Sequence, residues 1–183
     1  MILLAFGVAL WAGAHVWKRV APTHRAGFGE GGRAVVSLAL LASVVLMVLG
    51  YRAADAVAWW SPTPALKGVN NLLVLAGFYL FAASGMKSAA ARRLRHPQLI
   101  GFSLWAGAHL IVNGDAPSFL LFGGLLAWAL AEMALINRAG PDRRPPPPPV
   151  EWGKEARVAG AALLVFLAVG WLHGWLGPRA WGA

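Results

Sequence analysis

Two histidines of this chain lie in identical local sequences. The run Leu-Trp-Ala-Gly-Ala-His occurs twice, ending at His15 and at His109, and it places Trp11 and Trp105 four positions before the histidines. Helical positions four apart share a face, so each imidazole is expected to lie beside its own indole. Imidazole is a common metal ligand, and the chain has no cysteine that could offer a thiolate. Two imidazoles without sulfur suit haem iron, with one histidine on each side of the porphyrin, so we predict that His15 and His109 ligate haem.

Small residues flank both histidines, and two cations follow the first one. The alanines and glycine of each repeat leave space where a flat ligand could approach the imidazole. Lys18 and Arg19 lie one turn beyond His15, where they are expected to meet haem propionates at the cytoplasmic surface. An alternative stays open, in which each imidazole donates a hydrogen bond to a backbone carbonyl or a hydroxyl and only joins helices. Zinc is disfavoured, because it needs a third or fourth ligand and no carboxylate lies at a comparable depth.

A second polar motif, Arg95-His96-Pro97-Gln98, opens another apolar stretch. The helix N-terminus expected there, with the arginines around it, would attract an anion such as a carboxylate or a phosphate. Equally, His96 could be only a residue of the capping region before a proline at the first helical position. Glu132 is the one acid well inside an apolar stretch, and it is expected to reach the surface or to pair with Arg138 or an arginine of a neighbouring loop.

The composition places the chain in a membrane. Of its 183 residues, 58% are hydrophobic and 13% are charged, whereas a soluble domain carries about 25% charged residues. These values exclude a water-soluble enzyme and a disordered or fibrous chain. No Ser-His-Asp set, pair of carboxylates, phosphate-binding loop or zinc-protease motif supports a hydrolase or a nucleotidase.

Six apolar stretches are long enough to cross a bilayer core of about 30 Å as helices. They cover approximately residues 1–17, 34–51, 68–85, 97–113, 116–136 and 158–176. We therefore predict an all-α polytopic membrane protein with about six transmembrane helices in one bundle. Residues 1–140 form its core, residues 141–157 form a Pro-rich cytoplasmic linker, and residues 158–183 form the final transmembrane helix and a tail.

The distribution of cations predicts the orientation. Thirteen of the 16 Lys and Arg residues fall in three loops, at residues 18–33, 86–96 and 137–157. The positive-inside rule places these loops in the cytoplasm beside anionic lipid, and both termini outside. Without a eukaryotic targeting segment, the bacterial inner (plasma) membrane is the expected location. His173, which is flanked by tryptophans, is then expected in an aromatic belt at the outer surface. Cations spread over three short loops do not form one basic face, so nucleic acid is not an expected partner.

The two histidine-bearing stretches are three spans apart, so they cross the bilayer in opposite directions. This arrangement is typical of an inverted repeat, here of helices 1–3 and 4–6, with its site near mid-depth. Both histidines are expected near the midplane, offset by about 10 Å along the membrane normal.

The motifs Arg95-His96-Pro97-Gln98, Trp105-Ala106-Gly107-Ala108-His109 and Asn113-Gly114-Asp115 resemble the NnrU family over about residues 1–140. The early Gly13-Ala14-His15 and the six-span layout fit the same family. Bacterial members are associated with denitrification, in the expression or activity of nitrite and nitric oxide reductases. The resemblance therefore implies a role in nitrogen-oxide respiration, with components of those reductases as partners.

The same superfamily is similar to the plant zeta-carotene isomerase, a membrane enzyme that holds haem b through two histidines. The resemblance implies that His109, and with it His15, are the ligands of a haem b. The isomerase has a cysteine where this chain has Ala106, so a ligand switch that uses that cysteine is absent here. If histidines fill both positions of the iron that the porphyrin does not occupy, no position remains for a substrate. The resemblance then favours electron transfer, unless one histidine leaves the iron.

Two further classes of function remain as alternatives. The Arg-His-Pro start is distantly similar to membrane methyltransferases that use S-adenosylmethionine, for which His96 and Glu132 would be the candidate residues. Those enzymes carry paired glutamates, whereas Glu132 stands alone in this chain. The second alternative is a non-catalytic membrane assembly factor whose histidines only join helices.

Overall fold

The structure, a computed structural model, describes residues 1–142 and 144–177, and within them its secondary-structure elements are helices joined by loops, with no strand. Arg143, which belongs to the third basic loop, and residues 178–183 of the predicted tail lie outside the described residues. The helices are α1 (Ile2–Val20), α2 (Pro22–Gly27), α3 (Gly31–Arg52), α4 (Pro64–Gly85), α5 (Ala89–Arg93), α6 (Pro97–Val112), α7 (Ala116–Ser118), the π-helical turn η1 (Phe119–Gly123), α8 (Gly124–Arg138) and α9 (Trp152–Leu176). Helices α7, η1 and α8 follow one another without a break and together match the predicted span at 116–136.

Local sequence explains where several of these helices begin. Helix α4 starts at Pro64 after Thr63, whose hydroxyl accepts a hydrogen bond of 3.3 Å from the Leu66 N–H. Helix α6 starts at Pro97, as predicted, because a proline costs no hydrogen bond at the first helical position. Asp115 caps α7 by accepting a hydrogen bond of 2.8 Å from the Ser118 N–H.

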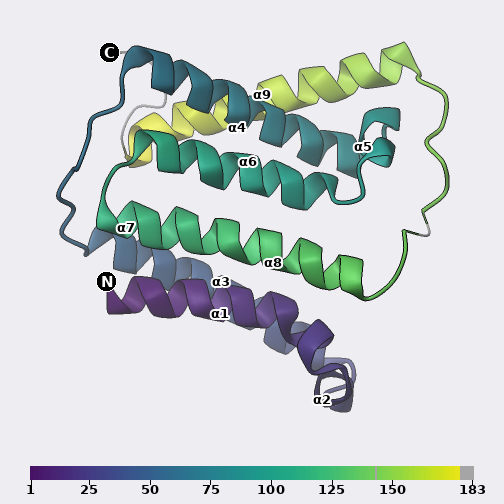
Figure 1. Cartoon of the computed structure of the whole chain (residues 1–183), viewed down its shortest axis with the longest axis horizontal. Helices are drawn as coiled ribbons and strands as arrows, with labels where there is room; N and C mark the ends of the chain where they lie inside the picture. Colours follow the sequence, from purple (N-terminus) through teal and green to yellow (C-terminus); the bar gives the residue numbers. More distant parts are fainter. Residues whose placement is uncertain (143, 178–183) are drawn as a thin grey trace.

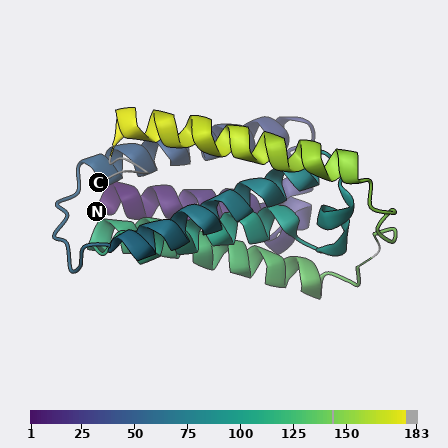
Figure 2. The ribbon, with the colours of Figure 1, turned by 90° about the horizontal axis from the view of Figure 1, so that it is seen from above.

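The long helices pack in the spatial order α3, α1, α8, α6, α4, α9 (Figure 1). Helix α8 therefore separates α1 from α6, the two helices that carry the repeated histidine sequence. Figure 2 shows α9 and α3 on the same side of the molecule. Arg52 at the end of α3 donates a hydrogen bond of 3.4 Å to the carbonyl of Leu176 at the end of α9, so the two outer helices of this order meet at one end.

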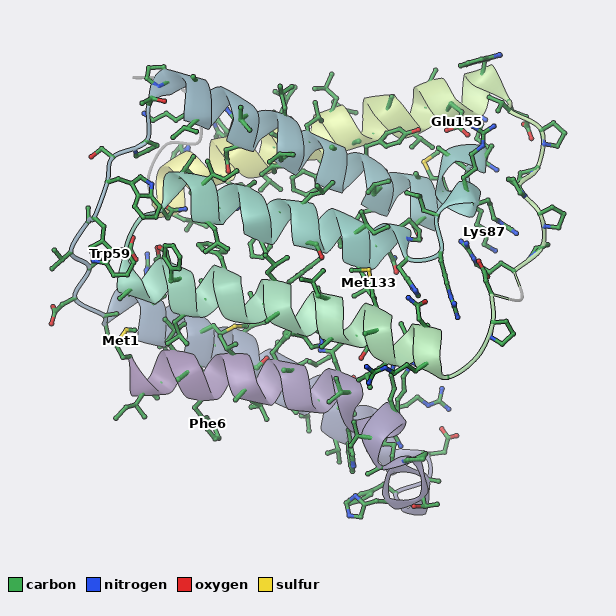
Figure 3. All side chains as sticks on the ribbon, in the orientation of Figure 1. Met1, Phe6, Trp59, Lys87, Met133 and Glu155 are labelled. Atoms are coloured by element: carbon green, nitrogen blue, oxygen red, sulfur yellow. The ribbon has the colours of Figure 1, made fainter. Side chains whose placement is uncertain are left out.

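Three basic segments lie at one end of the helices. Helix α2, helix α5 and the linker after α8 are together at that end, and the start of α1 and the end of α9 are at the other (Figure 1). Figure 3 likewise shows Lys87 at the end opposite Met1 and Trp59. The three predicted basic loops thus share one end of the molecule. That this end faces the cytoplasm stays a prediction of the positive-inside rule.

The surface and the helix lengths are those of a membrane protein. Four helical segments are long and apolar enough to cross a membrane: Gly31–Arg52, Pro64–Gly85, Ala116–Arg138 and Trp152–Leu176. Their outer faces expose large apolar side chains, such as Leu38 at 65% and Leu164 at 70%, which fits contact with lipid. Helix α6 is apolar but shorter, and α1 carries two cations in its last turn. The six-span count therefore remains a prediction beyond the four segments found.

Two boundaries differ from those predicted. Helix α9 begins at Trp152, so the second part of the predicted linker 141–157 is helical, because Glu155 is held by hydrogen bonds from the Tyr79 hydroxyl and the Ala89 N–H. The loop at 18–33 contains helix α2, which starts at a proline that suits a helix N-terminus.

The inverted repeat is not confirmed by the packing. The predicted helices 1–3 are α1, α3 and α4, and the predicted helices 4–6 are α6, α8 and α9. A two-fold relation between these halves exchanges α1 with α6 and α3 with α8. Because α1 packs against α8, it would also require α6 to pack against α3. The main neighbours of α3 are instead α1 and α2.

Candidate functional site

The two repeated histidines have the same local geometry. The Nδ1–H group of His15 donates a hydrogen bond of 2.9 Å to the Trp11 carbonyl, and that of His109 donates one of 2.9 Å to the Trp105 carbonyl. The ring centroids of Trp11 and His15 are 4.5 Å apart, and those of Trp105 and His109 are 5.0 Å apart. The expectation that each indole lies beside its imidazole is confirmed.

A second aromatic ring covers each imidazole from the central helix. The ring of Trp128 on α8 lies 4.4 Å from that of His15, and the ring of Phe122 on η1 lies 4.6 Å from that of His109. Each histidine therefore contacts an indole of its own helix and an aromatic ring of the η1–α8 segment, and these two rings also contact each other. The matched environment extends beyond the six repeated residues.

The π-helical turn η1 is the element that supplies Phe122. Such turns are rare and are frequent at functional sites. Phe122 is buried, with 7% of its surface exposed, and its ring also contacts that of Trp105 at 5.3 Å. Nothing in the sequence around Phe119–Gly123 distinguishes a π-helical turn from a regular helix.

Aromatic side chains fill the space between the two histidines. From His15 the ring contacts run through Trp128, Phe102 and Trp105 to His109, with centroid distances of 4.4, 5.2, 5.1 and 5.0 Å. Three rings thus separate the imidazoles, and the two histidines do not face one common cavity in this arrangement of side chains. The sequence did not predict this separation.

The hydrogen bonds determine which nitrogen of each imidazole is free to bind a metal. A carbonyl oxygen accepts, so Nδ1 must carry the proton, and in the neutral ring Nε2 then has a free lone pair. This is the arrangement of metal-ligating histidines, whose other nitrogen is usually held by a carbonyl or a carboxylate. Within the described residues, no three His, Asp or Glu side chains gather into a group that could hold a metal ion by themselves. Any metal here would need most of its ligands from a cofactor.

Arg19 and Glu132 form an ion pair beside His15. The Nε–H of Arg19 donates to Oε1 of Glu132, a residue with 6% of its surface exposed. Glu132 was expected to pair with Arg138 or with an arginine of a neighbouring loop, and Arg19 is such an arginine. The predicted contact of Arg19 with haem propionates is not needed to explain its position, whereas the exposed Lys18 remains open to such a contact.

Three buried polar atoms around this ion pair make no hydrogen bond within the described residues. They are Nε1 of Trp11, Nε1 of Trp128 and Oε2 of Glu132. Buried polar groups without a partner are uncommon and call for an explanation such as a water, an ion or a ligand. All three lie on the facing sides of α1 and α8, next to His15.

A third histidine lies near His109. His173 on α9 interacts electrostatically with His109, although the sequence predicted only an aromatic belt around it. The Asn70 side chain on α4 reaches the same region, because its amide in the better of two orientations donates a hydrogen bond of 3.1 Å to the Ala108 carbonyl. Asn70 and Asn71, two polar residues inside an apolar stretch, are the sequence signal that could have indicated this polar region.

Arg95 and His96 lie at the basic end of the molecule, away from these rings. Arg95 donates hydrogen bonds to the carbonyls of Gly140 at 2.6 Å and Ile136 at 3.4 Å. His96 shares a hydrogen bond of 2.8 Å with the Asn137 side chain. Both residues line a pocket of about 350 Å³. Because His96 and Glu132 have different partners, the structure gives no support to a methyltransferase site that combines them.

One comparison with known proteins gives a match. The family model described as NnrU protein matches residues 3–180, which is nearly the whole chain. No curated protein and no solved structure matches the chain.

Proposed function

The chain belongs to the NnrU family, and from this premise we propose that it is a membrane protein that binds haem b through His15 and His109. The observation that carries the proposal is the matched geometry of the two histidines. Each imidazole donates its Nδ1–H to a carbonyl of its own helix, contacts two aromatic rings, and keeps Nε2 for a ligand bond.

The Nε2 atoms of the two histidines suit haem iron, but aromatic side chains fill the space between them. Haem iron binds two imidazoles, and the porphyrin packs well against aromatic and apolar side chains. The rings of Trp128, Phe102 and Trp105 occupy the space that one haem between both histidines would need. Phe102 and Trp105 also border an apolar pocket of about 210 Å³ between α4 and α6, which offers room for their displacement. Haem binding by both histidines therefore requires these rings to move.

Haem content of purified variants tests the ligand assignment. We expect His15→Ala and His109→Ala to lose most of the bound haem, because each removes one of the two side chains that would hold it. His24→Ala is the matched control, since His24 lies on α2, outside the apolar helices, and should retain full haem content. If both single variants keep the wild-type haem content and spectrum, the assignment is wrong.

His173→Ala separates two ligand pairs. Under the proposal this variant keeps its haem, because His173 is not a ligand. Loss of haem in His173→Ala together with full retention in His15→Ala would instead assign the ligands to His109 and its neighbour on α9. That outcome would contradict the pair His15 and His109.

The proposal extends to a redox role in nitrogen-oxide respiration. Haem supplies one-electron redox chemistry, and iron held by two histidines has no open position for a substrate. The chain's part is then to bind the group, exclude water with the surrounding rings, and exchange electrons with components of the nitrite or nitric oxide reductases. An isomerase-like reaction would require one histidine to leave the iron.

Complementation tests this role. In a denitrifying bacterium that lacks its own family member, the wild-type chain should restore nitrite and nitric oxide reduction, and His109→Ala should not. Equal restoration by His109→Ala at equal protein level would refute a haem-dependent role and favour the assembly-factor alternative.

A further inference from the structure

The basic end of the molecule contains a pocket that the haem proposal does not use. Its walls come from the turn after α4, from α5, from the first turn of α6, from the end of α8 and from the linker. The pocket has a volume of about 350 Å³. Figure 3 shows Lys87 at this end of the molecule.

The lining is strongly cationic. The charged or titratable side chains in it are Lys87, Arg92, Arg95, His96 and Arg144, and no Asp or Glu is among the lining residues. Arg144 is neutralised by Asp142, with which it forms an ion pair of 2.7 Å. Within the described residues, Lys87, Arg92 and Arg95 form no ion pair.

The nearest acid on α9 does not neutralise the pocket. Glu155 accepts hydrogen bonds from the Ala89 N–H at 2.9 Å and from the Tyr79 hydroxyl at 3.2 Å, so its carboxylate is held at the start of α5. It is not among the residues that line the pocket. Asp142 also interacts electrostatically with Arg95, so it is chiefly the positive charge of Lys87 and Arg92 that is left for a ligand to balance.

One of the cations is held in place by backbone carbonyls. The Arg95 guanidinium donates to the carbonyls of Gly140 and Ile136, which position it without cancelling its charge. Lys87 has a φ of 52°, a left-handed conformation that is uncommon for a residue other than glycine. Here it ends α4, because the N–H groups of Lys87 and Ser88 donate to the carbonyls of Ser84 and Ala83.

The start of α6 adds backbone donors to this cationic lining. No side chain caps the helix at His96, and Pro97 has no N–H to offer. The N–H groups of the first turn, at Gln98 and Leu99, therefore point toward the pocket end of the helix, where the helix dipole also favours an anion. Both residues line the pocket.

We propose that this pocket binds a phosphate group through Lys87, Arg92 and Arg95 together with the first turn of α6. Guanidinium groups match the oxygens of a phosphate with paired hydrogen bonds, and a phosphate balances more positive charge than a carboxylate does. Ala91, Pro97 and Ile136 add apolar surface to the lining, so the group that bears the phosphate can be apolar. Two sources share this chemistry: the headgroup of an anionic phospholipid and a soluble phosphate ester.

Binding to the full chain in neutral detergent tests the proposal with two probes. Phosphatidylglycerol is the lipid probe, measured by native mass spectrometry, and inorganic pyrophosphate is the soluble probe, measured by titration calorimetry. We expect saturable binding at one site by at least one of them. Binding of phosphatidylglycerol alone assigns a lipid headgroup, and binding of pyrophosphate with similar affinity assigns a soluble ligand.

Arg92→Gln is the decisive variant, because within the described residues the Arg92 side chain makes no hydrogen bond or ion pair whose loss would disturb the fold. It should weaken binding at least tenfold, and Arg95→Gln should weaken it further. The matched control is Arg33→Gln, which removes the same charge at the same end from an exposed arginine paired with Glu30. It should change the affinity less than twofold.

Two results would overturn the proposal. One is the absence of saturable binding of both probes to the wild-type chain. The other is an equal loss of affinity in Arg92→Gln and Arg33→Gln, which would mean that overall charge attracts the probes without a site. Neither result depends on haem, so the outcome is independent of the proposed function.

Discussion

Adding a single methyl group at Gly77 should destabilise the bundle. Gly77 on α4 faces Gly101 on α6, and an ideal Cβ at Gly77 lies 2.8 Å from the carbonyl oxygen of Gly101. This is about 0.6 Å closer than an ordinary van der Waals contact. The obstacle is backbone and not the end of a flexible side chain, so the two helices must move apart along their interface.

The expected cost of Gly77→Ala follows from two opposing effects. Overpacking a close interface costs about 1–3 kcal/mol, and alanine regains up to about 1 kcal/mol in helix propensity. The free energy of unfolding should therefore fall by about 1–2 kcal/mol. Gly68→Ala on the same helix is the control, because a Cβ there meets nothing within 4 Å, and it should raise the free energy of unfolding by up to about 1 kcal/mol.

The assay is unfolding of both variants and the wild-type chain in one detergent, by titration with sodium dodecyl sulfate or by heating. The two substitutions are chemically identical and are predicted to have opposite signs. If Gly77→Ala is as stable as the wild type or more stable, the close approach of α4 and α6 is wrong.

The remaining predictions concern two ion pairs. Glu132→Ala should lower the free energy of unfolding by about 2–3 kcal/mol, because it leaves the partly buried Arg19 unpaired. Adding Arg19→Ala should cost less than the sum of the single variants, and full additivity in unfolding titrations would refute the pairing. The hydrogen bonds from Arg144 lower the pKa of the Asp142 carboxyl to about 2, so this pair persists at neutral pH and is lost only as the pH falls from about 4 toward 2. Asp142→Asn frees Arg144 and should strengthen phosphate binding about two- to fivefold at pH 7, whereas weaker binding in calorimetry would contradict the role of Arg144 in the pocket.

The sequence predicted the parts of the fold that depend on apolar runs and local signals. Pro97 begins α6 as expected, and the apolar stretches coincide with the long helices. The indoles Trp11 and Trp105 lie beside their histidines because positions four apart on a helix always share a face.

The parts that were missed depend on how distant helices pack. Nothing in the local sequence indicates that α8 stands between α1 and α6, so the rings that separate His15 from His109 could not be predicted. For the same reason the electrostatic contact of His173 with His109 was missed. The early start of α9 was missed as well, because the groups that hold Glu155 lie on α4 and α5, far away in the sequence.

The absorption spectrum of the purified chain tests the central claim most directly. The protein would be expressed with haem available, purified in mild detergent, and measured in the oxidised and reduced states. Ligation by His15 and His109 predicts a sharp Soret band and, after reduction, resolved α and β bands of low-spin haem b. A colourless protein that also fails to take up added hemin would contradict the claim, and it would leave the two histidines as residues that only join helices.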